Sequence, residues 1–408
     1  MGSRSGGTPM NATTRISFGT ATFLAAISLA SCADGPSELQ TLHRPNAAPE
    51  RDATKFWDAT ASTRWNARAL TLVGLQPPAN GQAATSRLLT YLSLAQYRAV
   101  LAAEKGSSKS THPSVPAAVS SASATVLNDF FPSFVTMIEG WLADDLAAPG
   151  WPGAQHEDVA SGLATGHAIA SAVLALKATD NYLVLSPGVP PVGTGYWFSA
   201  PNMAIVRSLY GTRPFFMTSS DQLRPPPPPV FGSPEYLAAR DEVRAISDTR
   251  TPEQIEIAQS NATATAPFTA GFQNLMADDL IREHHRTEHE AARILAYANA
   301  AAFDAQIACF DAKFTYWFIR PSQADHFIST VVALPNHPSY PSAHACITSA
   351  IMNVLIDAFP SERDRLEDFL RISGLSRIYA GLHYRFDVEA GETIGARAAA
   401  LARGGSLE

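Results

Sequence analysis

Three short blocks indicate both the fold and the chemistry of this chain: KFTYWFIRP at 313–321, PSYPSAH at 338–344 and SRIYAGLHYRFD at 376–387. Together they supply cationic, hydroxyl, imidazole and carboxylate groups in a fixed order, from Lys313, Arg320, Ser342 and His344 to Arg377, His383 and Asp387. Lysine, arginine, hydroxyl and backbone N–H donors suit the several oxygens of a phosphate or a vanadate. The combination therefore predicts a binding site for a tetrahedral oxyanion.

The two histidines are expected to have different roles. His383 and Asp387 are four residues apart, and at helical spacing both side chains face the same way. The Asp387 carboxylate is then expected to hold one ring N–H of His383 and to leave the other nitrogen facing the central atom. His344 follows Ser342 and Ala343, which offer hydroxyl and amide donors, and we expect it to move protons.

In these blocks the chain resembles the type 2 phosphatidic acid phosphatase and vanadium-dependent haloperoxidase superfamily. The family signature is Lys, six residues and Arg-Pro, then Pro-Ser-Gly-His, then Ser-Arg, five residues, His, three residues and Asp. The chain follows it from Lys313 to Asp387 and departs at Ala343, where the family usually has glycine. An alanine still offers its N–H to an oxyanion, but its methyl group narrows the approach and penalises a positive φ.

The resemblance implies a set of site residues. Residues that would bind the oxyanion are Lys313, Arg320, Ser342, Ala343, Arg377 and His383. If the oxyanion is vanadate, His383 would coordinate the vanadium, His344 would deprotonate hydrogen peroxide, and Lys313 would polarise the bound peroxide so that halide is oxidised. His337 and Trp317 are expected at the rim of the pocket. A histidine at position 337 resembles bromoperoxidases more than chloroperoxidases, which carry an aromatic residue there.

Two other functions fit the same residues. The alternative enzyme is an acid phosphatase without a cofactor, in which His383 forms a phosphohistidine and His344 protonates the leaving alcohol and then activates water. A third class is a non-catalytic lipoprotein with a decayed site, and Ala343 is the only feature in its favour. The small acid phosphatases share the three blocks but have no N-terminal bundle. The resemblance to the soluble haloperoxidase branch runs from about residue 60 to 403, so it favours a haloperoxidase-like enzyme.

Beyond the blocks, alanine- and leucine-rich segments with few β-branched alternations predict an all-α fold of two packed helical bundles. We expect an N-terminal bundle at 56–180, a proline-rich wrapping loop at 181–233, a catalytic bundle at 234–403 and a tail at 404–408. Helices are expected at 116–145 and 322–332, among others. The segment 84–100 is similar to 290–306, and 165–174 is similar to 342–351, which indicates an internal duplication.

The N-terminus has the pattern of an export signal. Arg15 precedes an apolar segment, and Leu29-Ala30-Ser31-Cys32 resembles a bacterial lipobox, so residues 1–32 are interpreted as a signal peptide and Cys32 as a lipidation site. The alternative is an ordinary cleaved signal with a chance cysteine. Residues 33–55 are expected to form a flexible tether. Both interpretations predict an exported protein. A lipoprotein would face the periplasm or the cell surface, whereas a protein with an ordinary cleaved signal would be secreted.

Composition narrows the partners. The formal net charge of −7 offers no basic surface for nucleic acid, and small-molecule substrates are expected instead. After the signal, no apolar run is expected to reach the roughly 18 residues of a membrane-spanning helix. Cys309 and Cys346 are interpreted as buried thiols, with a single disulfide as the alternative. The EHHRTEHE stretch at 283–290 is interpreted as a solvated charged face rather than a zinc site.

Overall fold

The computed structural model describes residues 61–79, 81–107, 112–147, 158–182, 184, 189–200, 209, 211–262 and 266–408. All of them belong to one compact unit, Thr54–Glu408. These residues form helices joined by loops, with two isolated bridges and no β-strand, and the all-α prediction is confirmed for them. Cys32 and the tether at 33–55 lie outside the described residues.

The helices follow one another along the chain in two groups separated by the segment 179–233. The first group is α2 (Ala61–Leu75), α3 (Gly81–Lys105), α4 (Val115–Phe130), α5 (Val135–Ala147) and α6 (Val159–Ala178). The second group is α7 (Pro234–Thr249), α8 (Pro252–Ser260), α9 (Phe268–Glu283), α10 (Glu288–Tyr316), α11 (Pro321–Ala324), α12 (Ala343–Ala358), α13 (Arg363–Tyr379) and α14 (Arg385–Gly404).

The central element is α10, the longest helix among the described residues. It begins with a capping box, in which Thr287 accepts from the backbone of Glu290 and Glu290 reaches back to Thr287. It ends at Trp317, which has a left-handed backbone conformation with φ 51°. Most of its residues are buried and many are alanine, so neighbouring helices can pack closely on several sides.

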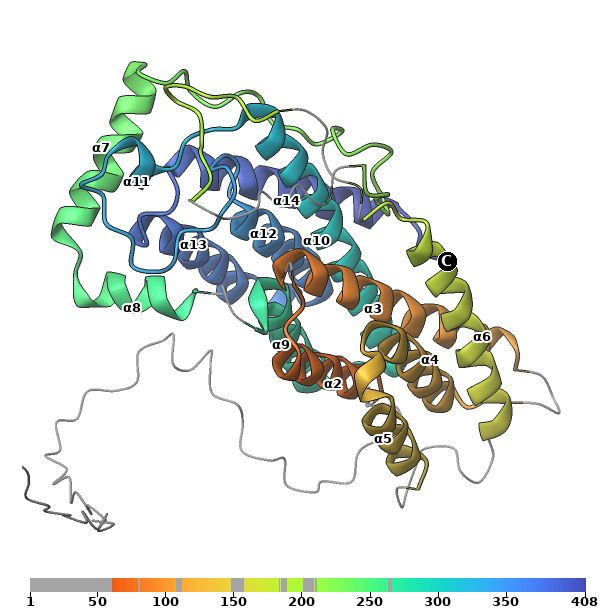
Figure 1. The fold of residues 1–408 in the computed structure, drawn as a ribbon. Coiled ribbons are helices and arrows are strands. Elements are labelled where there is room, and N and C mark those ends of the chain that lie inside the picture. Colours follow the sequence, from red (N-terminus) through yellow and green to blue (C-terminus); the bar gives the residue numbers. More distant parts are fainter. Residues whose placement is uncertain are drawn as a thin grey trace, which may run out of the picture. The chain divides into compact units, whose positions relative to one another are not determined.

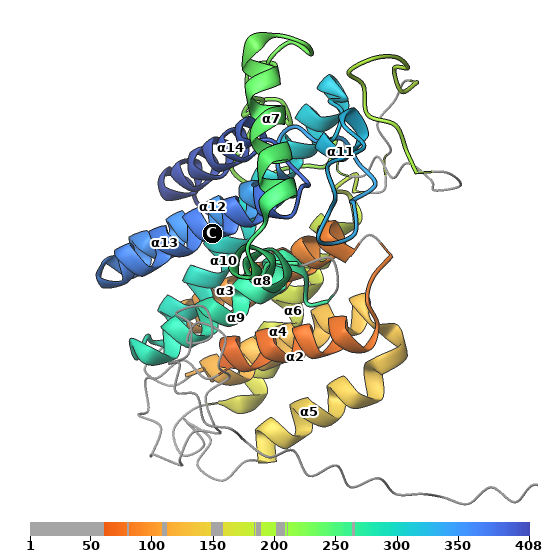
Figure 2. The ribbon, with the colours of Figure 1, turned by 90° about the vertical axis from the view of Figure 1, so that its left-hand side faces the viewer.

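Around α10, helices from both groups meet. It packs against α3 on one side and against α12 and α14 on another, and in Figures 1 and 2 α3 lies beside it in both views. Helices α4 and α6 pack on α3, whereas α13 packs on α12. The buried core is therefore continuous between the two groups. The predicted duplication and domain boundaries remain predictions.

The segment 179–233 is attached to α10 by hydrogen bonds and an ion pair with two aspartates of that helix. The Asp304 carboxylate accepts the N–H groups of Phe215, Phe216 and Met217 at 2.7, 2.7 and 2.9 Å. The Arg224 guanidinium bonds both oxygens of Asp311 at 2.6 and 2.9 Å. These contacts fix the start of the proline strip over the C-terminal half of α10.

Two helix predictions were wrong. The segment 116–145 is broken by Pro132, which lacks an N–H and begins a short 3-10 turn, so α4 ends at Phe130 and α5 starts at Val135. The segment 322–332 is helical only in the single turn α11. The chain then runs as a loop to the start of α12, and this loop contributes to the site described below.

The expectation about apolar runs was also wrong. By length and composition alone, α6 is long and apolar enough to cross a membrane. Its mean hydropathy is 1.6 over 18 residues, and 22% of these residues are buried in the fold. Its contact with α4 is made through glycines, because a Cβ on Gly166 would lie 2.1 Å from the carbonyl oxygen of Ala118. One face of α6 is therefore part of the helical packing.

Candidate active site

The three sequence blocks converge at the ends of five helices. Lys313 lies in the last turn of α10, Arg320 precedes α11, and Arg377 lies in the last turn of α13. Ser342 caps α12, and Asp387 lies in the first turn of α14. Helix ends leave backbone groups and side chains free to face a common centre, whereas helix middles do not.

The imidazole of His383 is held by Asp387. His383 Nδ1 lies 2.8 Å from Asp387 Oδ2, and both residues are buried. His383 itself precedes α14, so the two side chains meet because Asp387, in the first turn, reaches back, and not because both lie on one helix face. The same oxygen also accepts the Ser339 hydroxyl at 2.5 Å and the Tyr384 N–H at 3.2 Å.

The hydrogen bonds determine the tautomer of His383. Arg320 Nη1 lies 3.0 Å from His383 Nε2, and because a guanidinium only donates, this nitrogen accepts. The ring hydrogen is therefore on Nδ1 and is donated to Asp387. Burial, followed by the charges of Arg320 and Lys313, lowers the pKa of His383 well below its usual value. The ring is neutral, with the Nε2 lone pair on the side away from Asp387.

Burial makes the charged form of Asp387 unfavourable. Burial raises the pKa of Asp387 to about 6, despite the Ser339 hydrogen bond and the nearby Lys313 charge. Its second oxygen, Oδ1, is buried and has no hydrogen-bond partner among the described residues. A carboxylate held this way is ionised at neutral pH and becomes protonated in mild acid.

Arg320 lies behind His383 and connects it to the preceding loop. Its guanidinium donates to the carbonyl oxygens of Leu382 at 2.9 Å and His337 at 3.1 Å. It also lies 3.1 Å from His337 Nδ1. Burial lowers the pKa of Arg320 to about 10, so the group still carries its charge at neutral pH.

Lys313 is fully buried and bonds to backbone carbonyls. Its ammonium donates to Pro338 at 2.7 Å, to Ser339 at 2.8 Å and to Pro341. An ammonium has three donors, and these three carbonyls use all of them. In this geometry Lys313 holds the loop 338–341 in place and is not a wall of the cavity.

The start of α12 presents backbone donors. Ser342 is buried, its hydroxyl accepts from the Ala345 N–H, and its own N–H donates to the Asp387 carbonyl at 2.8 Å. Ala343 is the first residue of the helix, so its N–H has no acceptor within the helix, and the residue lines the cavity. A helix N-terminus favours an anion through these N–H groups and the helix dipole.

His344 is held between two hydroxyl groups. Its Nδ1 lies 3.2 Å from Thr269 Oγ1 and its Nε2 lies 2.8 Å from Ser373 Oγ. Burial, followed by the Arg377 charge, lowers the pKa of His344 well below its usual value. The neutral ring can accept a proton at neutral pH, as a general base must.

A cavity of about 340 Å³ connects these groups. Five predicted site residues line it: His337, Ala343, His344, Arg377 and His383. Four others, Lys313, Arg320, Ser342 and Asp387, lie behind this wall and hold it. Arg377 is buried, burial lowers its pKa to about 10, and it donates to the Asn261 carbonyl at 2.6 Å and to Ser376 Oγ at 2.9 Å.

The two predicted rim residues differ. His337 lines the cavity and packs against Phe310 with the two rings tilted, their centres 5.3 Å apart. Trp317 does not line it. Its side chain packs on Trp197 and Phe314, with ring centres 6.2 and 5.2 Å apart, so its position at the end of α10 serves the packing of the wrapping segment.

Sequence reasoning missed several residues of the site. Ser339 stands inside the second block, and its hydroxyl next to the motif could have been noticed. Thr269, Phe268 and Gly81 come from α9 and α3, outside the three blocks, and no local pattern marks them. Only the packing of the first helix group against the second brings them to the cavity.

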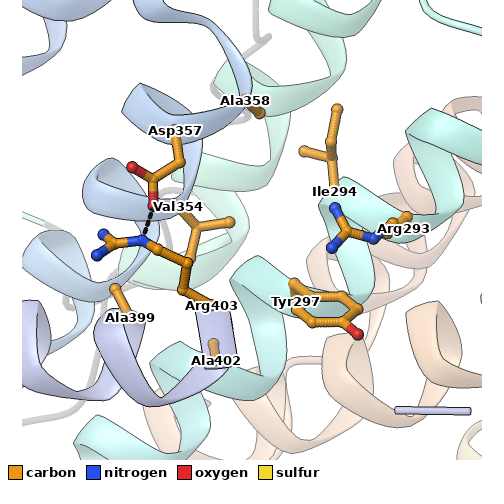
Figure 3. Close-up of a pocket in the computed structure, with 9 residues that line it drawn as sticks. All are labelled: Arg293, Ile294, Tyr297, Val354, Asp357, Ala358, Ala399, Ala402 and Arg403. Atoms are coloured by element: carbon orange, nitrogen blue, oxygen red, sulfur yellow. Dashed lines mark hydrogen bonds and ion pairs between the residues drawn. The ribbon is translucent and has the colours of Figure 1, made fainter. Parts of the chain in front are cut away.

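Other candidate sites lack this chemistry. A cavity of about 120 Å³ lies between α10, α12 and α14, where Arg403 Nε bonds Asp357 at 2.7 Å and Arg293 lies over the Tyr297 ring (Figure 3). No predicted site residue lines it. Cys309 and Cys346 are free, buried thiols. Among the described residues, no group of three His, Cys, Asp or Glu side chains could hold a metal ion.

The ends of these helices bring arginines, histidines and an aspartate together around one cavity of a helical protein. Residues 292–404 match the family model of the PAP2 superfamily. The C-terminal part of the chain, from most of α10 through α14, therefore resembles this superfamily.

Solved bacterial structures have the same fold. The crystal structure of the first bacterial vanadium-dependent iodoperoxidase aligns with a TM-score of 0.71 and 20% identity, over 85% of this chain and 96% of that one. A holo-type bacterial vanadium-dependent chloroperoxidase aligns with a TM-score of 0.67 and 15% identity, over 85% and 97%. At these identities the likeness concerns the fold.

Proposed function

We propose that this protein is a vanadium-dependent haloperoxidase-like enzyme that binds vanadate in the cavity and oxidises halide with hydrogen peroxide. The observation that carries the proposal is the buried, neutral His383, with its Nδ1–H on Asp387 and two buried arginines beside it. The similarity of fold over 85% of the chain, which extends well beyond the residues 292–404 of the family match, supports a haloperoxidase rather than a small phosphatase.

The residues present fit a tetrahedral oxyanion in most respects. Arg377, the Ala343 N–H, His344 and His383 line the cavity and supply positive charge, a hydrogen-bond donor and two imidazoles. Vanadate bound there would supply a Lewis-acidic centre for activating hydrogen peroxide toward halide. Lys313 and Arg320 are the exceptions, because neither lines the cavity. The donors of Lys313 are used by backbone carbonyls, and Arg320 donates to two carbonyls and to His383.

The chain's own groups then have distinct tasks. Asp387 fixes the ring of His383 and keeps its hydrogen on Nδ1, so that Nε2 carries the lone pair. Arg320 Nη1 donates to this lone pair here, and Nε2 would hold vanadate once that hydrogen bond is released. Arg377 and Arg320 offset the negative charge of the oxyanion. His344, neutral at working pH, accepts a proton from hydrogen peroxide. His383, Arg377 and Asp387 are buried, and the low local dielectric strengthens their electrostatic interactions.

One observation favours the second candidate, an acid phosphatase. The haloperoxidase role assigned to Lys313 needs its ammonium in the cavity, whereas here it binds the loop 338–341. A phosphatase can use the remaining groups: His383 Nε2 would attack phosphorus once its hydrogen bond from Arg320 is released, and Arg377 would stabilise the equatorial oxygens. His344, whose ring is neutral here, would protonate the leaving alcohol only after taking up a proton itself. Water then releases phosphate from the phosphohistidine.

The deciding experiment is reconstitution with orthovanadate. Halogenation of monochlorodimedone with bromide or iodide and peroxide is expected with vanadate, and p-nitrophenyl phosphate hydrolysis is measured without it. Ester hydrolysis that vanadate inhibits, together with no halogenation, would establish the phosphatase instead. A His383→Ala variant that retained both activities would contradict both candidates.

A further inference from the structure

The cavity is larger and less polar than an oxyanion requires. Away from the arginine and histidines, its walls are mostly apolar and are contributed by Ala262, Phe268, Val332, Leu334, Pro335 and Leu382. A volume of about 340 Å³ lies within the range of small-molecule pockets, about 300 to 1,000 Å³. Pockets of this kind combine an apolar wall with a few placed polar groups, as this one does.

One wall residue has a strained backbone. Phe268, the first residue of α9, has φ 61°, in the left-handed region that a bulky residue rarely adopts. Such a conformation persists only where the surroundings determine it, and it is concentrated at functional sites. Phe268 is 7% exposed and faces both the core and the cavity.

The ring of Phe268 rests on Gly81, the first residue of α3. A Cβ added to Gly81 would lie 2.0 Å from the ring carbon Cζ and 2.4 Å from Cε1. Gly81 has no positive φ, so the glycine is required there for space and not for backbone conformation. Any side chain at position 81 must displace the ring, and both residues line the cavity.

The same segment reaches the proton-moving histidine. Thr269, directly after Phe268, bonds His344 Nδ1 at 3.2 Å, and its N–H donates to the Gln82 side chain at 3.2 Å. Residues 81 and 82 of α3 therefore contact residues 268 and 269 of α9 in register. A molecule packed against Phe268 would lie next to His344.

We propose that the cavity binds an apolar organic molecule beside the oxyanion, and that the Phe268 ring, seated on Gly81, determines the size of the group it accepts. The chemistry done on that molecule rests on the proposed function. In halogenation, halide loses two electrons, hydrogen peroxide and two protons give two waters, and the acceptor exchanges one of its C–H hydrogens for halogen. In the phosphatase alternative, the same walls hold the alcohol part of the ester.

The binding test uses phosphonates, which join a tetrahedral oxyanion to an apolar group and need no turnover. In the wild-type protein without vanadate, calorimetry is expected to show phenylphosphonate binding on the order of tenfold more tightly than methylphosphonate, because the ring is buried. 1-Naphthylphosphonate is expected to bind no more tightly than phenylphosphonate. Equal affinities for the methyl and phenyl compounds, or no binding of either, would overturn the proposal.

Two variants change the wall in opposite directions. Phe268→Gly removes the ring and suits the left-handed backbone, so naphthylphosphonate is expected to gain on the order of tenfold relative to phenylphosphonate. Gly81→Ala pushes the ring aside and is expected to reduce phenylphosphonate affinity several-fold while leaving methylphosphonate unchanged. Phe272→Ala is the matched control, because Phe272 lies one turn along α9, stacks on Phe369 and does not line the cavity.

An acceptor-free assay separates this inference from the proposed function. Triiodide formation from iodide, peroxide and vanadate needs no organic molecule. If triiodide forms and Phe268→Gly leaves the phosphonate ratios at wild-type values, the size-determining role of Phe268 is wrong while the haloperoxidase stands. If the affinity ratios change as expected and no triiodide forms, the proposed role of Phe268 in the cavity is supported and the proposed haloperoxidase activity is contradicted.

Discussion

Replacing Asp387 with asparagine should weaken vanadate binding without lowering the free energy of unfolding. The substitution keeps the shape of the side chain but removes the charge that accepts the His383 Nδ1–H at 2.8 Å. A hydrogen bond to a charged group contributes about 1.5 to 3 kcal/mol, which corresponds to a loss of vanadate affinity of about ten- to hundredfold. This range agrees with the effect of removing the group that orients a metal-binding histidine, about 10- to 100-fold.

The same change should not destabilise the fold at pH 7. Burial raises the pKa of Asp387 from 3.8 to about 6, so its protonated form is the one that folding favours. The stability associated with that form is present below pH 3.8 and is lost as the pH rises through about 6. At neutral pH the buried charge costs up to about 3 kcal/mol, and asparagine avoids this cost. The free energy of unfolding of Asp387→Asn is therefore expected to equal or exceed that of the wild type.

The assay combines vanadate titration by calorimetry with denaturant unfolding at pH 7. Ser339→Ala is the matched control, because it removes a neutral donor to the same oxygen, 2.5 Å away, and leaves the His383 bond intact. Its effect on affinity should be the smaller one. Wild-type vanadate affinity in a folded Asp387→Asn protein would refute the assigned role of the carboxylate, and a large loss of stability would refute the burial argument.

Four further predictions concern the pH profile, two buried polar groups and the N-terminus. Vanadate affinity of the wild type should fall as the pH drops through about 6, because a protonated Asp387 is uncharged and a weaker acceptor for the His383 N–H, and this step should be absent in Asp387→Asn. Lys313→Met should lower the free energy of unfolding by at least about 3 kcal/mol in urea, because three backbone carbonyls lose their donor; an unchanged value would show that the ammonium does not hold the loop. Asp304→Asn should lower the free energy of unfolding by about 1 to 3 kcal/mol, because one amide oxygen replaces two carboxylate oxygens that accept three N–H groups. Vanadate affinity should stay at the wild-type level. Cys32→Ala should abolish incorporation of labelled palmitate in a bacterial host; labelling that persists would contradict lipidation at Cys32.

Sequence reasoning reached the helical class and the constellation because both depend on local patterns. Helices were visible in the alanine- and leucine-rich composition, and the three blocks carry their residues at short, fixed spacings. The ends of the helices were harder to predict from the sequence. Pro132 divides one predicted helix, and the loop after α11 replaces another, because the N–H missing at proline and the tertiary contacts of the loop outweighed the local preference for helix.

The positions of the charges required the tertiary structure. Sequence spacing placed Lys313 among the oxyanion ligands, but its length and burial let it reach three carbonyls of the loop 338–341, whose path no local pattern specifies. The wall formed by Phe268 on Gly81 joins residues far apart in the chain, and it exists only because α9 packs against α3. The sequence by itself determined which charged and imidazole groups the three blocks contribute, since their chemistry is a property of residue type. The packing of the helices decided which of those groups face the cavity and which support it, since burial and hydrogen-bond partners arise only when distant segments meet.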